Sequence, residues 1–299
     1  MIKKFLKDPK IYFISLLGRV LRGSIWADKI YLSILFRYRL KRKLDFKNPK
    51  TYNEKLQWMK IYDKNPLYSK LADKYEVRKY IANKIGEEYL IPLIGVWNSF
   101  DEIDFDKMPN EFILKCTHDS GSVIICTDKN SFDKKKARKK FNHWMKRNYY
   151  INTREWPYKD IEPKIIAEKL IGEKGEAPID YKFYCFNGVV DCVMLCFDRG
   201  SGNTKFCYFN REWEKLPYIK DEFDACKNKV IYKPEPIDKM FELAEKLCKQ
   251  FRSVRIDMYF EDNKIYFGEI TFFSQSGFTI DLPDDIDKKW GDMINLKEV

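Results

Sequence analysis

The sequence has little histidine and lacks any long apolar run. Only two histidines, His118 and His143, occur among 299 residues, so a zinc site built from histidine is not expected. No apolar stretch approaches the roughly 20 residues that a membrane-spanning helix needs. The most apolar early segment is interrupted by Arg19, and nothing in it resembles a secretion signal with its cleavage site. These absences favour a cytoplasmic protein.

The cysteines form no CxxC pair, although eight of them are present. Most lie inside apolar runs that are typical of strands, where a free thiol behaves as a small buried hydrophobic side chain. We therefore expect reduced thiols rather than disulfides, as in most cytoplasmic proteins. The eight are Cys116, Cys126, Cys185, Cys192, Cys196, Cys207, Cys226 and Cys248.

Positive charge is concentrated in one terminal segment. Residues 1–43 carry twelve basic and two acidic side chains, so they supply +10 of the formal net charge of +11. These charges are interspersed with Ile, Leu, Phe, Trp and Tyr, a pattern that favours a basic amphipathic helix on an anionic membrane surface. A solvated helical face is the alternative. Nucleic acid is not an expected partner, because the rest of the chain is close to neutral.

Helical and strand patterns are interspersed without regular strand–helix–strand alternation, which favours an α+β fold. The segment Thr51–Glu54 is a capping box that opens a helix. We expect further helices over 66–84, 132–148 and 237–251. The expected strands cover 90–97, 111–116, 123–127, 165–171, 181–186, 189–197, 204–209, 254–260 and 264–272.

Two acidic side chains occur in the last expected hairpin, within otherwise apolar strands. A tight turn at 261–264 makes these strands antiparallel partners and brings Asp257 close to Glu269. Two buried like charges are costly without a cation. Magnesium typically uses one or two carboxylates and completes its shell with substrate phosphates. A pair of carboxylates bridged by Arg255 is the alternative.

The earlier hairpin places a lysine next to a loop of small residues. Lys115 ends the first strand, and Ser120, Gly121 and Ser122 offer free backbone N–H groups that can fold over phosphates. It is not a P-loop, because the GK[ST] ending is absent, and an ordinary hairpin turn is the alternative. Glu168 and Lys169 lie in an apolar strand, where they present hydrogen-bonding groups to a purine edge or form an ion pair.

The order of these features resembles the ATP-grasp superfamily, and within it the TupA-like branch found among bacterial surface-polysaccharide genes. The resemblance covers roughly residues 45–299. It is carried by TYNEKLQWMKIYDKNPLYSKLADKYEVRKYI, FILKCTHDSGSVII, REWPYKDIEPKIIAEKLI, DYKFYCFNG and VRIDMYFEDNKIYFGEITFFSQSGF.

The resemblance implies an ATP-grasp fold with two α+β lobes that grip a nucleotide, preceded by a basic helical segment. The implied organisation is residues 1–48 for the basic segment and 49–110 for a helical region. Residues 111–171 would form subdomain A with the lid loop, and 172–299 subdomain B with the metal site.

The resemblance also implies a role for each matching residue, with ATP and Mg²⁺ as cofactors. Arg255 and Lys182 would be catalytic, and Asp257, Glu269 and Thr271 would hold the metal. Thr271 stands where the family has an Asn. Asp119 precedes the lid where a glycine is usual, which predicts a positive φ there. The nucleotide-binding residues would be Lys74, Lys115, Ser120, Gly121, Ser122, Glu168, Lys169 and Leu170.

The implied reaction is a carboxylate–amine ligation through an acylphosphate. The expected substrates are an acidic sugar or glycan and an amino acid or amine, and the enzyme would work at the inner face of the cytoplasmic membrane. A glycosyltransferase is one alternative, with Asp104 and Asp106 as the nearest match to its DxD site. A non-catalytic nucleotide-binding protein is another, favoured by Thr271 and Asp119. No Ser-His-Asp or Cys-His constellation is needed for the ligation.

Overall fold

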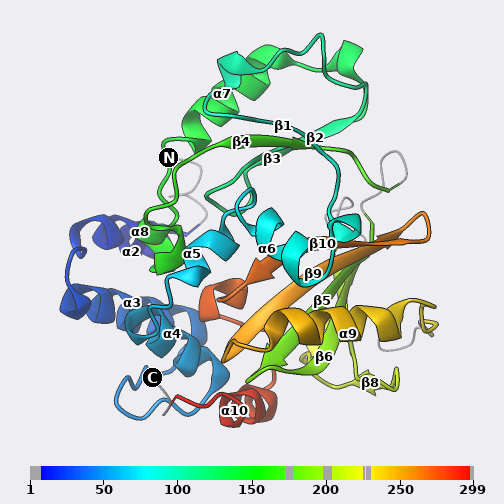
Figure 1. Ribbon diagram of the computed structural model, residues 1–299. Coiled ribbons are helices and arrows are strands. Elements are labelled where there is room, and N and C mark those ends of the chain that lie inside the picture. The colour runs from blue at the N-terminus through cyan, green and yellow to red at the C-terminus, as the bar shows by residue number, and fades with distance from the viewer. Residues whose placement is uncertain (1–7, 173–177, 198–203, 225, 227–229, 297–299) are drawn as a thin grey trace.

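Two antiparallel sheets organise the chain, in agreement with the expected α+β class. The computed structural model describes residues 8–172, 178–197, 204–224, 226 and 230–296. The four-stranded sheet has the order β1-β4-β2-β3 and the six-stranded sheet has the order β10-β9-β5-β6-β7-β8. In Figure 1 the smaller sheet lies above the larger one, and the N-terminal helices lie beside the larger lobe.

The four-stranded sheet has its own aromatic core. Phe112 and Phe141 are completely buried, and Phe100 stacks on Phe141 with ring centroids 5.7 Å apart. Phe141 lies on α7 (Lys134–Trp144), which is shorter at both ends than the expected helix over 132–148. The strands are β1 (Leu93–Trp97), β2 (Phe112–Cys116), β3 (Val123–Cys126) and β4 (Ile165–Glu168).

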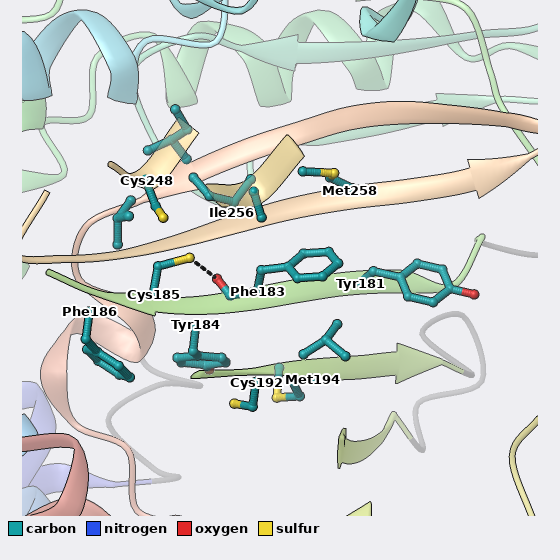
Figure 2. Packing of buried hydrophobic residues seen from close by; sticks show 14 of the residues in the cluster. Tyr181, Phe183, Tyr184, Cys185, Phe186, Cys192, Met194, Cys248, Ile256 and Met258 are labelled. Atoms are coloured by element: carbon teal, nitrogen blue, oxygen red, sulfur yellow. Dashed lines mark hydrogen bonds between the residues drawn. The ribbon is translucent and has the colours of Figure 1, made fainter. Parts of the chain in front are cut away.

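The six-stranded sheet buries both of its faces along β5 (Asp180–Phe186). Figure 2 shows Phe183 and Cys185 on one side of this strand and Tyr184 and Phe186 on the other, as the two-residue period of a strand requires. The first side is covered by α9 (Ile237–Cys248). The remaining strands are β6 (Val189–Phe197), β7 (Lys205–Phe209), β8 (Lys215–Leu216), β9 (Ser253–Glu261) and β10 (Lys264–Thr271).

The hairpin between β9 and β10 forms where the sequence predicts it. Asp262 and Asn263 have φ values of 51° and 56°, the left-handed conformation that a two-residue hairpin turn favours. Gly268 then makes an irregularity in the register between Phe267 and Glu269. A Cβ at Gly268 would lie 3.0 Å from the Asp257 carbonyl oxygen, so the close approach of the strands favours glycine there.

The helix expected over 66–84 is interrupted. Two helices form instead, α5 (Leu67–Ala72) and α6 (Val77–Lys84). The Asp73 carboxylate accepts hydrogen bonds from the backbone N–H groups of Tyr75 and Glu76, at 2.7 and 3.1 Å. These bonds stabilise a turn in place of a continuous helix. The break matters for the site because it places Lys74 at the cleft described below.

The predicted capping box of Thr51 and Glu54 is present and opens α4 (Tyr52–Tyr62). Residues 49–110, which the resemblance implies to be one helical region, contribute to both the larger and the smaller lobe. Helices α4 to α6 join the core of the six-stranded sheet, whereas β1 is part of the smaller sheet. Helix α10 (Asp284–Asp292) contacts α4, and its Trp290 is completely buried against Tyr184 and Tyr52.

The basic N-terminal segment forms two helices, α2 (Pro9–Val20) and α3 (Ile25–Leu40), joined by a short turn. Their inner side is a packed core around Tyr31, Leu32 and Phe36. Arg154 is 1% exposed and fastens both helices, because it donates to Asp28 at 2.5 Å and to backbone oxygens of the first helix and the turn. None of the helices in the described ranges has the length and apolarity that a bilayer crossing requires.

The expectation of eight reduced cysteines is wrong for one pair. Cys207 in β7 and Cys226 form a disulfide, with Cα atoms 6.1 Å apart. The two lie 19 residues apart in sequence, and only the return of the chain past β8 brings them within bonding distance. The other six cysteine side chains are buried, as expected.

Candidate functional site

Three adjacent strands place Lys182, Asp257 and Glu269 in one row. Asp257 on β9 is the register partner of both Lys182 on β5 and Glu269 on β10. Directly opposite residues in antiparallel strands share a face, so all three side chains leave the sheet on the same side. The Lys182 ammonium lies 2.5 Å from Asp257 Oδ2 and 2.9 Å from Asp180 Oδ2.

The two predicted metal ligands are bridged by Arg255, which is the alternative arrangement that the sequence left open. Arg255 donates to Asp257 at 2.7 and 2.8 Å and to Glu269 Oε1 at 3.0 Å. Burial opposes ionisation of Asp257, but the Arg255 and Lys182 charges outweigh it and lower the pKa of this carboxyl to about 2. Thr271 completes the group through its hydroxyl, 3.2 Å from Glu269 Oε1.

Lys182, Asp257 and Glu269 line a cavity of about 240 Å³ between the two sheets, whereas Arg255 and Thr271 line the larger cavity described below. Most of the residues predicted from sequence to bind a nucleotide or metal line the smaller cavity, although they come from five separate segments. The charged or small residues in its wall are Lys74, Arg78, Lys115, Ser120, Gly121, Glu168, Asp180, Lys182, Asp257, Gly268 and Glu269.

The smaller sheet contributes a second ionic cluster to this cavity. Glu168 accepts from the Lys115 ammonium at 2.7 Å and from the Arg78 guanidinium at 2.9 Å. Strands β2 and β4 are neighbours, which explains the first contact. Arg78 was not predicted, because a single arginine on a helix gives no sequence signal of this kind.

The loop after β2 is closed by Lys74 and Asp119. The Lys74 ammonium donates to the backbone oxygen of Asp119, and burial lowers the pKa of this lysine. The predicted positive φ at Asp119 is wrong, since Gly121 takes that conformation instead, with φ of 86°. The Asp119 side chain is buried and accepts from Ser122 Oγ at 2.5 Å, so it braces the loop from within.

Some predicted residues lie apart from this cavity. Among the described residues, Ser122, Lys169, Leu170, Arg255 and Thr271 do not line it. Ser122 turns toward Asp119, β4 ends at Glu168, and Arg255 and Thr271 line the larger cavity. The Lys169 side chain is exposed, while its backbone N–H donates to the Pro92 oxygen at 3.0 Å. Asp104 and Asp106 lie in an exposed loop that lines neither this cavity nor the larger one beside it.

A larger cavity of about 550 Å³ adjoins the first. Ser120 and Glu269 line both, so the two spaces meet at the lid loop and the acidic end of β10. The sequence did not predict this cavity, although REWPY contains two of its residues. Its polar lining includes Tyr31, Arg39, Tyr149, Asn152, Thr153, Glu155, Tyr158, Arg255, Thr271, Gln275 and Ser276.

The donor set between the strands suits a hard cation that arrives with its own ligands. Across the described part of the chain, three or more His, Cys, Asp or Glu side chains nowhere gather to hold a metal. The side chain of Glu269 is 46% exposed, whereas both oxygens of Asp257 are bonded to cations. Two carboxylates with phosphate oxygens make a set that Mg²⁺ uses. Such an ion fits once Lys182 and Arg255 turn to another anion.

A profile of TupA-like ATP-grasp proteins matches residues 54–295. The chain belongs to the TupA-like ATP-grasp family. The match begins within α4 and leaves out α2 and α3, so the N-terminal helices that wall the larger cavity lie outside the family's shared region. A search of curated proteins gave no match.

Among solved structures, this ATP-grasp chain is similar to D-alanine–D-alanine ligase from Bacillus anthracis, with 15% identity and a TM-score of 0.39 over 68% of this chain and 57% of that one. It is similar to the ADP complex of N5-carboxyaminoimidazole ribonucleotide synthetase, with 14% identity and a TM-score of 0.46, covering 83% and 56%. It is also similar to the ATP-grasp ligase PsnB in complex with Mg and ADP, with 11% identity and a TM-score of 0.42 over 80% of this chain and 63% of that one. The chain thus spans about three-fifths of the length of these structures, and the similarities are too loose to transfer a residue role.

Proposed function

We propose that this protein is an ATP- and Mg²⁺-dependent carboxylate–amine ligase. One observation carries the proposal: Lys182, Asp257 and Glu269 form a row across three strands and face a cavity that Lys74 and Lys115 also line. The cavity thus offers cations for a triphosphate and two carboxylates for its metal ion. ATP-dependent ligation is the reaction implied by the family, and the similar structures include ligases, one of them in complex with Mg and ADP.

The chain's own residues would act mainly by positioning and charge. Lys74, Lys115 and Lys182 would offset the negative charge of the triphosphate as charge moves during transfer. The backbone N–H groups of Ser120 and Gly121 would close over the phosphates. Magnesium held by Asp257 and Glu269 would neutralise phosphate oxygens and align the transfer. Arg255 lines the larger cavity, bonds to Asp257 and Glu269, and would stabilise the oxyanion that forms at the acyl carbon.

The proposed reaction has two steps. The substrate carboxylate attacks the γ-phosphorus of ATP, giving an acylphosphate and ADP. The amine then attacks the acyl carbon, so that a C–N bond forms, the C–O bond to phosphate breaks, and inorganic phosphate and a proton leave. We propose an acidic sugar of a surface polysaccharide, or its precursor, as the carboxylate substrate and an amino acid or other amine as the nucleophile. This choice rests on the association of the TupA-like branch with bacterial surface-polysaccharide genes.

The basic N-terminal helices support a peripheral membrane location. Phe13, Val20 and Trp26 on α2 and α3 have exposed fractions of 61%, 78% and 69%, and they lie among Arg19 and Arg22. Apolar side chains beside basic ones are what an anionic interface binds. Deleting residues 1–43 would also remove the core around Tyr31, so surface substitutions are the cleaner test.

That test is co-sedimentation with two kinds of vesicle. One is phosphatidylcholine alone, and the other contains about 30% phosphatidylserine, which imitates an anionic membrane surface. The wild type should bind the anionic vesicles, and the double change Phe13→Ser with Trp26→Ser should release it. A matched pair at exposed apolar sites elsewhere, Val230→Ser with Tyr232→Ser, should leave binding intact. Equal binding by all three proteins would rule the surface out.

Nucleotide choice tests the ligase proposal itself. ATP with Mg²⁺ should raise the melting temperature of the wild type, because a ligand that binds only the folded state stabilises it. EDTA should remove part of the shift, and a UDP-sugar with Mg²⁺ should give none. A shift with the UDP-sugar alone would favour the glycosyltransferase alternative. Binding of ATP without ADP release across uronic acids and amines would favour the non-catalytic one, for which Thr271 remains the supporting residue.

A further inference from the structure

The larger cavity contains a buried carboxylate with an oxygen that the described chain leaves without a hydrogen-bond partner. Glu155 is 4% exposed, and its Oε1 has no donor within reach among the described residues. A buried carboxylate oxygen without a donor is costly, so such groups are few in folded proteins. The position therefore points to a donor that arrives with a ligand.

The two nearest cations are already used. Lys60 has three N–H donors, and these bond Thr153 O at 2.8 Å, Ser276 O at 2.8 Å and Ser276 Oγ at 3.0 Å. Arg154 directs its guanidinium away, toward Asp28 and backbone oxygens of the N-terminal helices and its own helix. Neither can satisfy Oε1 without abandoning its own partners, so this buried oxygen is left without a protein donor in the wall of the cavity.

The surroundings of Glu155 suit a cationic donor. Tyr149 and Tyr158 line the same cavity and meet edge to face, with ring centroids 5.1 Å apart. Glu269, which reaches the nucleotide cavity too, adds a second negative charge. Arg39 and Arg255 also line the cavity, and Arg255 is paired with Glu269. Close to Glu155 itself, the aromatic rings and the unpaired carboxylate oxygen favour an ammonium group over an anion or a neutral hydroxyl.

We propose that the larger cavity is the amine site of the ligase and that Glu155 Oε1 binds the ammonium group of the nucleophile and takes its proton. This inference rests on the proposed ligase function and adds the residue that selects the amine. The proton passes from the ammonium to the Glu155 carboxylate, which leaves a neutral amine with a free electron pair. That pair attacks the acyl carbon and forms the C–N bond. The C–O bond to phosphate breaks, the departing phosphate takes its electron pair and the second proton of the nitrogen, and Glu155 releases its own proton to solvent.

The acid strength of Glu155 agrees with this role. Burial raises its pKa to about 7, against the opposing effect of Lys60. Burial likewise lowers the pKa of Lys60 to about 7. Amine binding should therefore strengthen as pH rises through about 7, where the carboxylate forms. The charged or titratable groups that interact with Glu155 are Lys60, Tyr149, Tyr158 and Glu269.

The experiment measures thermal shifts with the common amino acids and with methylamine and ethanolamine, each added to protein holding a non-hydrolysable ATP analogue and Mg²⁺. At least one primary amine should stabilise the wild type. Glu155→Gln, which keeps the size of the side chain, should weaken that amine at least tenfold and leave the nucleotide shift unchanged. Glu162→Gln, at an exposed site three residues before β4 begins, should alter neither shift.

The outcomes separate this inference from the ligase proposal. A missing nucleotide shift in the wild type would count against the ligase, whatever the amines do. A normal nucleotide shift with no amine response, or with an equal amine response in Glu155→Gln, would overturn the amine site. If Glu155→Gln fails to fold, Glu155→Asp gives the same decision, because it keeps the charge but withdraws it from the cavity and should also weaken the amine.

Discussion

The two cavities differ in whether their buried carboxylates are paired with cations of the chain. In the smaller one, Asp257 is held by Lys182 and Arg255, and Glu168 by Lys115 and Arg78. In the larger one, an oxygen of Glu155 lacks a protein donor while Lys60 beside it is fully bonded elsewhere. A cavity whose charges neutralise one another is stable when empty. A cavity with an unsatisfied carboxylate gains most from a ligand.

Changing each acid to its amide gives the largest contrast. Asp257→Asn should destabilise the empty protein by about 3–5 kcal/mol, because it leaves Arg255 and Lys182 buried without their partner. It should also abolish the Mg²⁺-dependent part of the ATP shift. Chemical denaturation and thermal shifts measure both. Asp106→Asn, at an exposed acid outside both cavities, should change neither, and a similar loss there would undermine the assignment.

Glu155→Gln should stabilise the folded protein at high pH, which is opposite to the effect of Asp257→Asn. The pKa of Glu155 is raised by burial to about 7, so its folded state holds a proton that the unfolded chain has lost above about pH 4.5. The contribution of this group is therefore present at low pH and lost as pH rises through 7. The variant should match the wild type near pH 5 and be more stable than the wild type at pH 8, where the wild type has to bury an ionised carboxylate. Urea unfolding at both pH values decides it, and destabilisation at pH 8 would contradict the contrast.

A smaller effect is expected at the second ionic cluster of the smaller cavity. Lys115→Met should weaken ATP about 10- to 100-fold, in line with the roughly 1.5–3 kcal/mol of a hydrogen bond to a charged group. Amine-induced shifts at saturating nucleotide should persist. Calorimetric titration with ATP measures the change, with the exposed Lys135→Met as its control. Loss of amine binding alone would mean that the two cavities are assigned the wrong way round.

The smallest effect is expected at Lys169. Its side chain is exposed, and only its backbone is fixed, through the bond to Pro92. Lys169→Ala should therefore change stability by less than about 0.5 kcal/mol. ATP affinity should be equally unaffected. A larger loss of ATP affinity would show that the side chain itself reaches the nucleotide, and would extend the smaller cavity beyond the end of β4.

Much of the lining of the smaller cavity could be predicted from the sequence, because its residues break a regular pattern. Asp257 and Glu269 interrupt apolar strands whose pairing is fixed by a short turn, so their proximity follows from local rules. Asp180 was missed although it precedes Lys182 by two residues on a completely buried strand. The same two-residue period that placed Lys182 on the face of the site could have found it.

The residues that line the larger cavity could not be predicted from such local patterns. Glu155 belongs to REWPY, which stands out for its composition, but its neighbours Lys60, Glu269 and Ser276 are distant in sequence. The disulfide between Cys207 and Cys226 was missed for the same reason, since strand-like burial of each cysteine says nothing about its partner. The break in the helix at Asp73 was a local event, but a side-chain turn competes with helix formation too closely for periodicity to decide it.

The sequence by itself determined the α+β class, the two hairpins and the acids they carry, because periodicity and turn chemistry act over a few residues. Only the tertiary structure decided that Arg255 bridges those acids, that Asp119 turns inward, and that the N-terminal helices wall a second cavity around Glu155. The physical reason is that a buried charge takes its state from whatever lies within a few ångströms of it. Which groups lie there depends on how distant segments pack together.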